Sequence, residues 1–318
     1  MRRHTLMIPA ALLAAPLLTA CGGSDDGPEV VASAYPFAFV AERVAGDRYT
    51  VENLTQPGGE PHDLELTPRQ VGDVQDATLV VYTEHFQTAV DEAVEQADRA
   101  EDATVELGGV VGLLEASEDE EEHDHAEEED HEGEEHSEEE GHDHGGVDPH
   151  FWLDPQRMIL AADAVAEALS EIDPDHAADY EANAAELTEE LQALHEEYVT
   201  GLETCERRSI VTSHAAFAYL ADAYDLTQIP IAGLDPSAEP TSEQLAEITD
   251  LVTSQGITTV FTEELVAPDK AEQVAHETGA TVATLDPIEG LSDETSDEDY
   301  LSLMRANLEA IRQADGCQ

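Results

Sequence analysis

Short runs of β-branched residues alternate with amphipathic segments along two stretches of this chain. In the first stretch, strands are predicted at 30–33, 50–53, 79–82 and 104–107, and helices at 36–45, 68–76 and 86–97. In the second stretch, strands are predicted at 209–212, 228–231, 258–262 and 281–285, and helices at 215–223, 242–254, 269–276 and 298–314. Alternation of strands and helices is typical of parallel sheets that are covered on both faces. The pattern therefore predicts two similar α/β lobes.

A long helical pattern separates the two stretches. Residues 155–202 are rich in Ala, Leu and Glu, with apolar residues at helical spacing, and only Asp173-Pro174 interrupts them. A continuous helix of this length would reach about 60–70 Å. We expect two Rossmann-like lobes joined by one long rigid helix, with an N-terminal lobe at 29–153, the linker helix at 154–203 and a C-terminal lobe at 204–318.

The first residues of the chain have the pattern of an export signal. Arg2 and Arg3 precede a nearly uncharged stretch that ends in Leu18-Thr19-Ala20-Cys21. The apolar run is shorter than the ~20 residues that span a bilayer, so it indicates a removable signal at 1–20 rather than an anchor. The end of this run resembles the lipobox of bacterial lipoproteins, which predicts lipid on Cys21 and a tether at 21–28. An ordinary signal peptide with an incidental cysteine is the alternative.

The charge of the chain limits its partners. The formal net charge is -62, with only 12 Lys and Arg against 74 Asp and Glu. Such a surface repels phosphate backbones and anionic lipid head groups, and it attracts cations. We therefore expect no nucleic-acid partner, and contact with the membrane only through the lipid on Cys21.

The segment from Glu115 to Gly146 contains 18 of the 74 acidic residues and six of the 14 histidines. Its composition cannot bury enough apolar surface to fold alone, so we expect a disordered acidic loop. One interpretation is a solvated charge block with incidental histidines. The other, which we favour, is loose auxiliary capture of metal by His123, His125, His131, His136, His142 and His144.

Two cysteines remain after Cys21. Cys205 and Cys317 belong to a chain that we expect to be exported to an oxidising compartment, so one disulfide between them is predicted. Two free buried thiols are the alternative.

Four residues that can bind metal follow predicted strands or end the acidic segment. Ligands of open parallel sheets bind outside the carboxyl ends of the strands. His62 lies in "QPGGEPHDLELTP", His150 in "VDPHFWLDP" and His214 in "IVTSHAAF", while "TVATLDPIEGL" contains Asp286. Each alone is an ordinary loop residue, but three imidazoles and a carboxylate that face one cleft match a tetrahedral zinc site.

These motifs also carry a family resemblance. "GGEPHDLELTP", "PHFWLDP", "SHAAF" and "LDP", in this order around a long helical segment, resemble the zinc and manganese substrate-binding lipoproteins of bacterial ABC transporters. The resemblance implies that His62, His150, His214 and Asp286 hold the metal between the lobes. Histidine at the third position favours zinc, where many manganese-binding members have glutamate. Glu60 is an alternative oxygen ligand, and His85 a less favoured fifth ligand.

The expected function is that of a monomeric, lipid-anchored extracytoplasmic receptor that captures Zn²⁺ and delivers it to an ABC permease and its ATPase. It is not expected to be an enzyme. A manganese or iron receptor of the same type is the first alternative. A zinc hydrolase would keep one coordination position for water, and a metal-buffering adhesin would have no permease.

Overall fold

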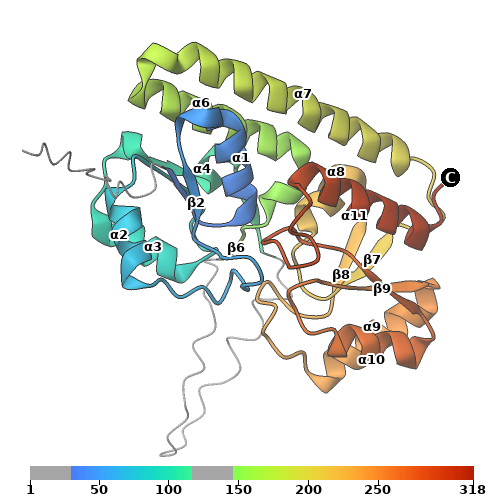
Figure 1. Cartoon of the computed structure of the whole chain (residues 1–318). Helices are drawn as coiled ribbons and strands as arrows, with labels where there is room; N and C mark the ends of the chain where they lie inside the picture. The colour runs from blue at the N-terminus through green and yellow to red at the C-terminus, as the bar shows by residue number, and fades with distance from the viewer. Residues whose placement is uncertain (1–29, 117–145) are drawn as a thin grey trace, which may run out of the picture.

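The structure is a computed structural model that describes residues 30–116 and 146–318 (Figure 1). The predicted signal, the tether with Cys21 and the six histidines of the acidic segment lie outside the described residues. Within the two described ranges, no helix combines the length and the apolar character that crossing a bilayer requires. These ranges form two lobes, each with a parallel sheet and helices, which confirms the predicted α/β class.

The N-terminal lobe contains a four-stranded parallel sheet in the order β2-β1-β3-β4. Val31 and Val80 pack with α2 and α3 on one face of the sheet, while Val30 and Leu79 pack into the central core on the other face. Both faces are therefore buried, as the short β-branched runs predict. The elements of this lobe are β1 (Val30–Ala32), α1 (Tyr35–Ala45), η1 (Gly46–Arg48), β2 (Val51–Asn53), α2 (Pro68–Asp76), β3 (Leu79–Tyr82), α3 (Thr88–Ala97), η2 (Glu101–Ala103), β4 (Thr104–Glu106) and α4 (Leu107–Val111).

The C-terminal lobe has a second parallel sheet in the order β10-β9-β7-β8. Numbered from its own first strand, this order repeats that of the first sheet, so the two lobes share one topology. Val211 and Val260 pack toward α9 and α10, and Ile210 and Phe261 pack into the central core. The elements are β7 (Ser209–Thr212), α8 (Ala218–Tyr224), β8 (Thr227–Pro230), α9 (Ser242–Gln255), β9 (Thr259–Thr262), α10 (Asp269–Thr278), β10 (Thr281–Thr284) and α11 (Tyr300–Asp315).

The segment predicted as one long helix forms two helices that pack side by side (Figure 1). These are α6 (Pro155–Ile172) and α7 (Ala177–Gly201), joined by η4 (Pro174–His176). The prediction of one continuous helix was wrong, because Pro174 cannot continue a helix. Asp173 stabilises the turn: it accepts a hydrogen bond from Tyr180 Oη at 2.9 Å and pairs with His176 Nδ1 at 2.7 Å. The helix that joins the lobes is α7, and its 25 residues extend about 38 Å.

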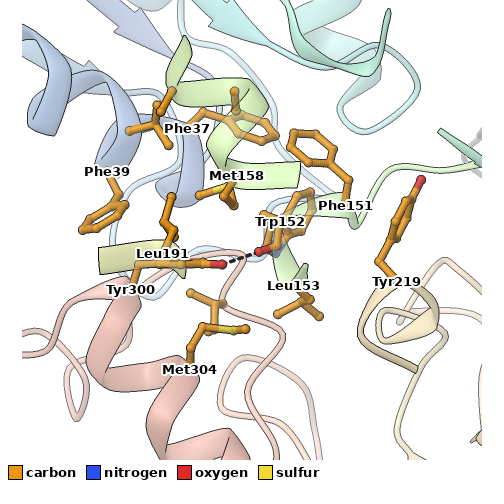
Figure 2. Close-up of a cluster of buried hydrophobic side chains, with 14 of the residues drawn as sticks. Phe37, Phe39, Phe151, Trp152, Leu153, Met158, Leu191, Tyr219, Tyr300 and Met304 are labelled. Carbon is orange, nitrogen blue, oxygen red and sulfur yellow. Dashed lines mark hydrogen bonds between the residues drawn. The ribbon is translucent and has the colours of Figure 1, made fainter. Parts of the chain in front are cut away.

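One hydrophobic core extends through both lobes (Figure 2). Phe37 and Phe39 of α1 meet Met158 of α6 and Leu191 of α7, and α11 contributes Tyr300. Around them, Trp152 of η3 (Phe151–Leu153) is fully buried, and its carbonyl accepts a hydrogen bond from Tyr300 Oη at 2.6 Å. Since residues of both lobes fill the same core, the lobes are packed together rather than only tethered.

Two short features fix the ends of the acidic segment and the end of the chain. β5 (Leu114–Glu115) pairs antiparallel with β6 (Val147–Asp148), so the two ends of the predicted acidic loop lie side by side. Cys205, which follows α7, forms a disulfide with Cys317, which follows α11. The predicted pairing of these two cysteines is confirmed.

Candidate metal centre

Three imidazoles and one carboxylate meet between the lobes. His62, His150, His214 and Glu289 each offer one ligand atom, and these four atoms all lie within 4.8 Å of one another. The four residues are 0–2% exposed. The structure therefore brings together the three histidines that the sequence predicted, but the carboxylate in this group is Glu289, which the sequence analysis did not select.

Four of the distances between these atoms are close to those expected around a tetrahedral metal ion. Glu289 Oε1 lies 3.1 Å from His214 Nε2, 3.2 Å from His150 Nε2 and 3.6 Å from His62 Nε2. The Nε2 atoms of His62 and His150 are 3.3 Å apart. Zinc bonds to nitrogen and oxygen of about 2.0–2.1 Å place the corners of a tetrahedron about 3.3–3.4 Å apart. The printed distances are close to this spacing, and all four donor atoms lie within 4.8 Å of one another, so the group can surround one zinc-sized ion.

His62 is held by a loop between β2 and α2. Gln87 holds this loop in place, because its Nε2 donates to Thr55 Oγ1 at 2.9 Å and to the Pro61 carbonyl at 3.2 Å. The ring of Phe86 meets the His62 ring edge-on, with centroids 4.9 Å apart. The loop ends at Thr67, which forms a capping box with Gln70 and so starts α2 at a fixed place.

His150 and His214 are each oriented by a buried carboxylate. His150 Nδ1 pairs with Asp148 Oδ1 at 2.7 Å, and His214 Nδ1 pairs with Glu263 Oε2 at 2.8 Å. A proton held on Nδ1 by its carboxylate leaves the Nε2 lone pair for a metal, which is the usual arrangement of metal-binding histidines. The sequence analysis missed both carboxylates, although Asp148 lies in the quoted "VDPH" motif.

Glu289 is positioned by the loop that follows β10. Ile288 has a φ of 57°, in the left-handed region that a β-branched residue rarely adopts. Asp286 stabilises this turn, because its Oδ1 accepts from the Ile288 N–H at 2.8 Å and its own N–H donates to Asn307 Oδ1 at 2.9 Å. Asp286 therefore shapes the loop that presents Glu289, and it does not belong to the group of four ligand atoms.

The remaining candidates lie outside the group of four. Glu60 Oε2 accepts from the Asp63 N–H at 2.9 Å. His85 is exposed, and its backbone N–H donates to Asp91 Oδ2 at 3.0 Å. Trp152 packs against the site, with its ring centroid 5.2 Å from that of His150, and its indole N–H donates to the Pro287 carbonyl at 2.7 Å. The auxiliary histidines are not among the described residues.

The electrostatics of the centre follow from burial and opposite charge. Burial alone would raise the pKa of Glu289, but His214 and His62 hold it well below its usual range. Burial would lower the pKa of His214, but Glu263 and Glu289 raise it well above its usual range. By the same balance, Asp148 and Glu289 raise the pKa of His150, whereas burial lowers that of His62.

Two nearby carboxyls have the opposite character. Burial, with repulsion from Glu289, raises the pKa of Asp286 to about 7, and the same two causes raise the pKa of Glu60 to about 7. Of these three carboxyls, Glu289 is the one that the imidazoles stabilise as an anion.

Fold and site together define a two-lobed α/β protein with a buried centre for a divalent metal at the junction of the lobes. The chain belongs to the family described as "Zinc-uptake complex component A periplasmic", which matches residues 30–314.

Individual relatives support this assignment. The chain is 37% identical over 320 residues to the zinc-binding lipoprotein AdcA of Streptococcus pneumoniae, covering 98% of this chain and 61% of that protein. It is 34% identical over 311 residues to the high-affinity zinc uptake system protein ZnuA of Bacillus subtilis, covering 93% of each. The solved structure of the Zn(II)-bound ZnuA-like domain of Streptococcus pneumoniae AdcA superposes with a TM-score of 0.72 at 33% identity, over 91% of this chain and 99% of that one.

Proposed function

We propose that this protein is an extracytoplasmic receptor that binds Zn²⁺ and delivers it to an ABC permease driven by an ATPase. The observation that carries the proposal is the convergence of three buried imidazoles and Glu289, whose ligand atoms lie within 4.8 Å of one another. The names of relatives as zinc-binding and zinc-uptake proteins support it. The chain spans 61% of the length of the Streptococcus pneumoniae relative, so only the shared part informs the proposal.

Zinc is favoured over manganese or iron because of the donor atoms. Imidazole nitrogen suits zinc, whereas manganese prefers oxygen ligands and higher coordination numbers. Three of the four donors are imidazole nitrogens, and all four donor atoms lie within 4.8 Å of one another. We therefore propose His62, His150, His214 and Glu289 as the ligand set, with Asp286 shaping the loop that presents Glu289.

We propose binding and release rather than catalysis. A zinc hydrolase keeps one position of its metal for water, whereas the four protein donors here would complete a tetrahedron. Hydrolysis of a chromogenic ester or peptide that is lost on chelation and regained with zinc would instead support the hydrolase alternative.

The function is tested by equilibrium titration. Protein stripped with a chelator and dialysed is titrated with Zn²⁺, and separately with Mn²⁺ and Fe²⁺, against a competing indicator. We expect one tight site for zinc and much weaker binding of manganese and iron. Tight manganese binding with weak zinc binding would favour the first alternative.

Two further parts of the proposal concern residues outside the described structure. We propose that lipid on Cys21 anchors the protein to the membrane and that the protein acts as a monomer.

We also propose that the six histidines between 117 and 145 gather zinc loosely. Replacing residues 118–144 by a short turn that keeps the β5–β6 pair should remove weak, multiple zinc binding and leave the tight site. Loss of the tight site in this variant would mean that the segment supplies ligands to it.

A further inference from the structure

A pocket of about 310 Å³ opens beside the metal centre. Most of its lining belongs to two segments of the C-terminal lobe, with residues 231, 232 and 236–240 from the first and 265–267 and 269–271 from the second. Two of its lining residues are close in sequence to histidines of the metal centre. Ser213 directly precedes His214, and Glu60 is two residues before His62. The pocket therefore connects the solvent with the loops that carry two of the four donors.

The centre itself is closed by contact between the lobes. The Gly58 N–H donates to the Leu291 carbonyl at 2.7 Å, which joins the loop of His62 to the loop of Glu289. A Cβ on Gly290 would lie 3.3 Å from Leu265 Cδ1 and 3.6 Å from the Gly59 carbonyl oxygen, so little space remains along this seam. The two loops are thus in contact along this seam, whereas the pocket beside it is wide enough for several water molecules.

The charges of the pocket suit a cation in transit. Asp269 is exposed, whereas Glu60 Oε1 is buried and accepts no hydrogen bond within the described ranges. At the rim, Lys270 pairs with Glu239 at 2.6 Å, and Lys270 is the only lysine of the chain.

We propose that this pocket is the route by which the cation reaches the metal centre, and that Glu60 binds the cation transiently before it passes to the imidazoles. The inference rests on the proposed zinc-binding function. A buried carboxylate oxygen without a partner replaces part of the water that the cation loses, and so offsets the cost of desolvation on the way. Because Glu60 stabilises the cation in transit and not the cation bound at the metal centre, it accelerates binding and release equally and leaves the equilibrium constant unchanged.

The test separates rates from affinity. Association is followed by stopped flow with Zn²⁺ in the presence of a fluorescent zinc indicator, and dissociation by transfer of zinc to a strong chelator. In Glu60→Gln we expect both rates to fall about tenfold, the scale of local electrostatic steering, with Kd unchanged within about twofold. Glu65→Gln, on the same loop but exposed and outside the pocket, is the charge-matched control and should keep the parent rates.

A second pair of variants tests the route without altering Glu60. Ala238→Trp places an indole on an exposed position of the pocket wall and should slow both rates. Ala185→Trp introduces the same side chain in the groove between α6 and α7 and should leave both rates unchanged. Lys270→Gln removes the positive charge of the rim and should raise the association rate several-fold at low salt, opposite in sign to Glu60→Gln.

The outcomes distinguish this inference from the proposed function. If the parent binds no zinc tightly at equilibrium, the proposed function itself fails. If the parent binds zinc tightly but Glu60→Gln and Ala238→Trp keep its rates, the route is wrong and the receptor function stands. A weaker Kd caused by faster release alone in Glu60→Gln would make Glu60 a permanent ligand and overturn the transient role.

Discussion

The backbone conformation of Ile288 determines which of two carboxylates, Asp286 or Glu289, joins the metal centre. Its φ of 57° costs on the order of 1 kcal/mol or more for a β-branched residue, and the hydrogen bond from its N–H to Asp286 helps to offset this cost. The turn directs Glu289 toward the imidazoles and keeps Asp286 in the loop. Strain at this residue is thus part of how the metal centre is built.

Replacing the two carboxylates should therefore give unequal results. Glu289→Gln should weaken zinc binding by at least ~100-fold, because it removes a charged donor that contacts three imidazoles. Asp286→Asn keeps an oxygen that accepts from the Ile288 N–H, so it should change the affinity by less than ~10-fold. Competitive titration with a chelator of known affinity measures both variants. The reverse order of effects would restore Asp286, the residue favoured by the sequence, as the ligand.

The pKa shifts of the imidazoles predict how binding depends on pH. Asp148, Glu263 and Glu289 raise the pKa values of His150 and His214 in the metal-free protein, so protons compete with zinc at higher pH than for ordinary imidazoles. Below these raised values, the apparent affinity should fall ~10- to 100-fold per pH unit, because one or two protons must leave.

Calorimetry in two buffers with different ionisation enthalpies counts the protons released. We expect between one and two at pH 6, with a smaller number as the pH rises. Binding that releases no protons at pH 6 would contradict the assignment of the raised pKa values.

At the scale of elements, the two helix–helix junctions determine how the lobes are held together. The turn at η4 returns α7 along α6, and the end of α7 lies beside the end of α11. Beyond this junction, two hydrogen bonds reinforce the disulfide. The Glu206 N–H donates to the Asp315 carbonyl at 3.0 Å, and the Thr204 side chain donates through Oγ1 to the Gln318 carbonyl at 3.1 Å. The C-terminus is therefore fastened to the linker helix.

Removing the disulfide should lower stability but not affinity. The cross-link joins residues separated by 112 positions, and the chain-entropy estimate for a loop of this size is about 4–5 kcal/mol. The Cys205→Ser/Cys317→Ser double variant should melt at a lower temperature than the oxidised parent and at about the temperature of the reduced parent. Its zinc affinity should match that of the parent, because neither cysteine contacts the metal centre. A large loss of affinity would show that the cross-link positions the lobes.

Much of the element order could be predicted from the sequence, and particular residues show where this ends. The runs at β3 and β9 are short, β-branched and buried on both faces, so their pattern alone indicates strands. Asp173-Pro174 marks a break in the helical pattern, but only the packing of α6 on α7 decides that the chain reverses there. The three histidines were found because each lies in a loop with a recognisable motif. Glu289 was missed because the conformation of Ile288, which presents it, leaves no pattern in the sequence.

At the scale of the whole molecule, the stability gained from the hydrophobic core has to exceed the repulsion caused by a large excess of negative charge. One hydrophobic cluster joins residues of both lobes with α6 and α7, and each lobe has a smaller cluster of its own, whereas the chain has a net charge of -62. Within the described ranges, the ion pairs between Arg or Lys and acidic groups involve mostly exposed partners, such as Arg48 with Asp179, and such pairs contribute little to stability. Repulsion among surface carboxylates must therefore be offset by the core.

Added salt should consequently stabilise the fold. The Debye length falls from ~10 Å at 0.1 M to ~3 Å at 1 M, which screens repulsion between surface carboxylates. We expect the melting temperature of metal-free protein to rise by several degrees between 0.1 and 1 M, to a similar extent in NaCl and KCl. Sucrose at equal osmolality serves as the uncharged control. A melting temperature that falls with salt would show that attractive ion pairs outweigh the repulsion.

The position of Trp152 has an optical consequence. It is the only tryptophan of the chain, so every photon of intrinsic indole emission comes from one fully buried ring. That ring lies 5.2 Å from His150 and is hydrogen-bonded through its N–H to Pro287 of the opposite lobe. Charge arriving at the imidazoles and any separation of the lobes both alter the surroundings of the same chromophore. The protein thus contains a reporter at the metal centre, and its loading can be followed by its own fluorescence, with no dye attached.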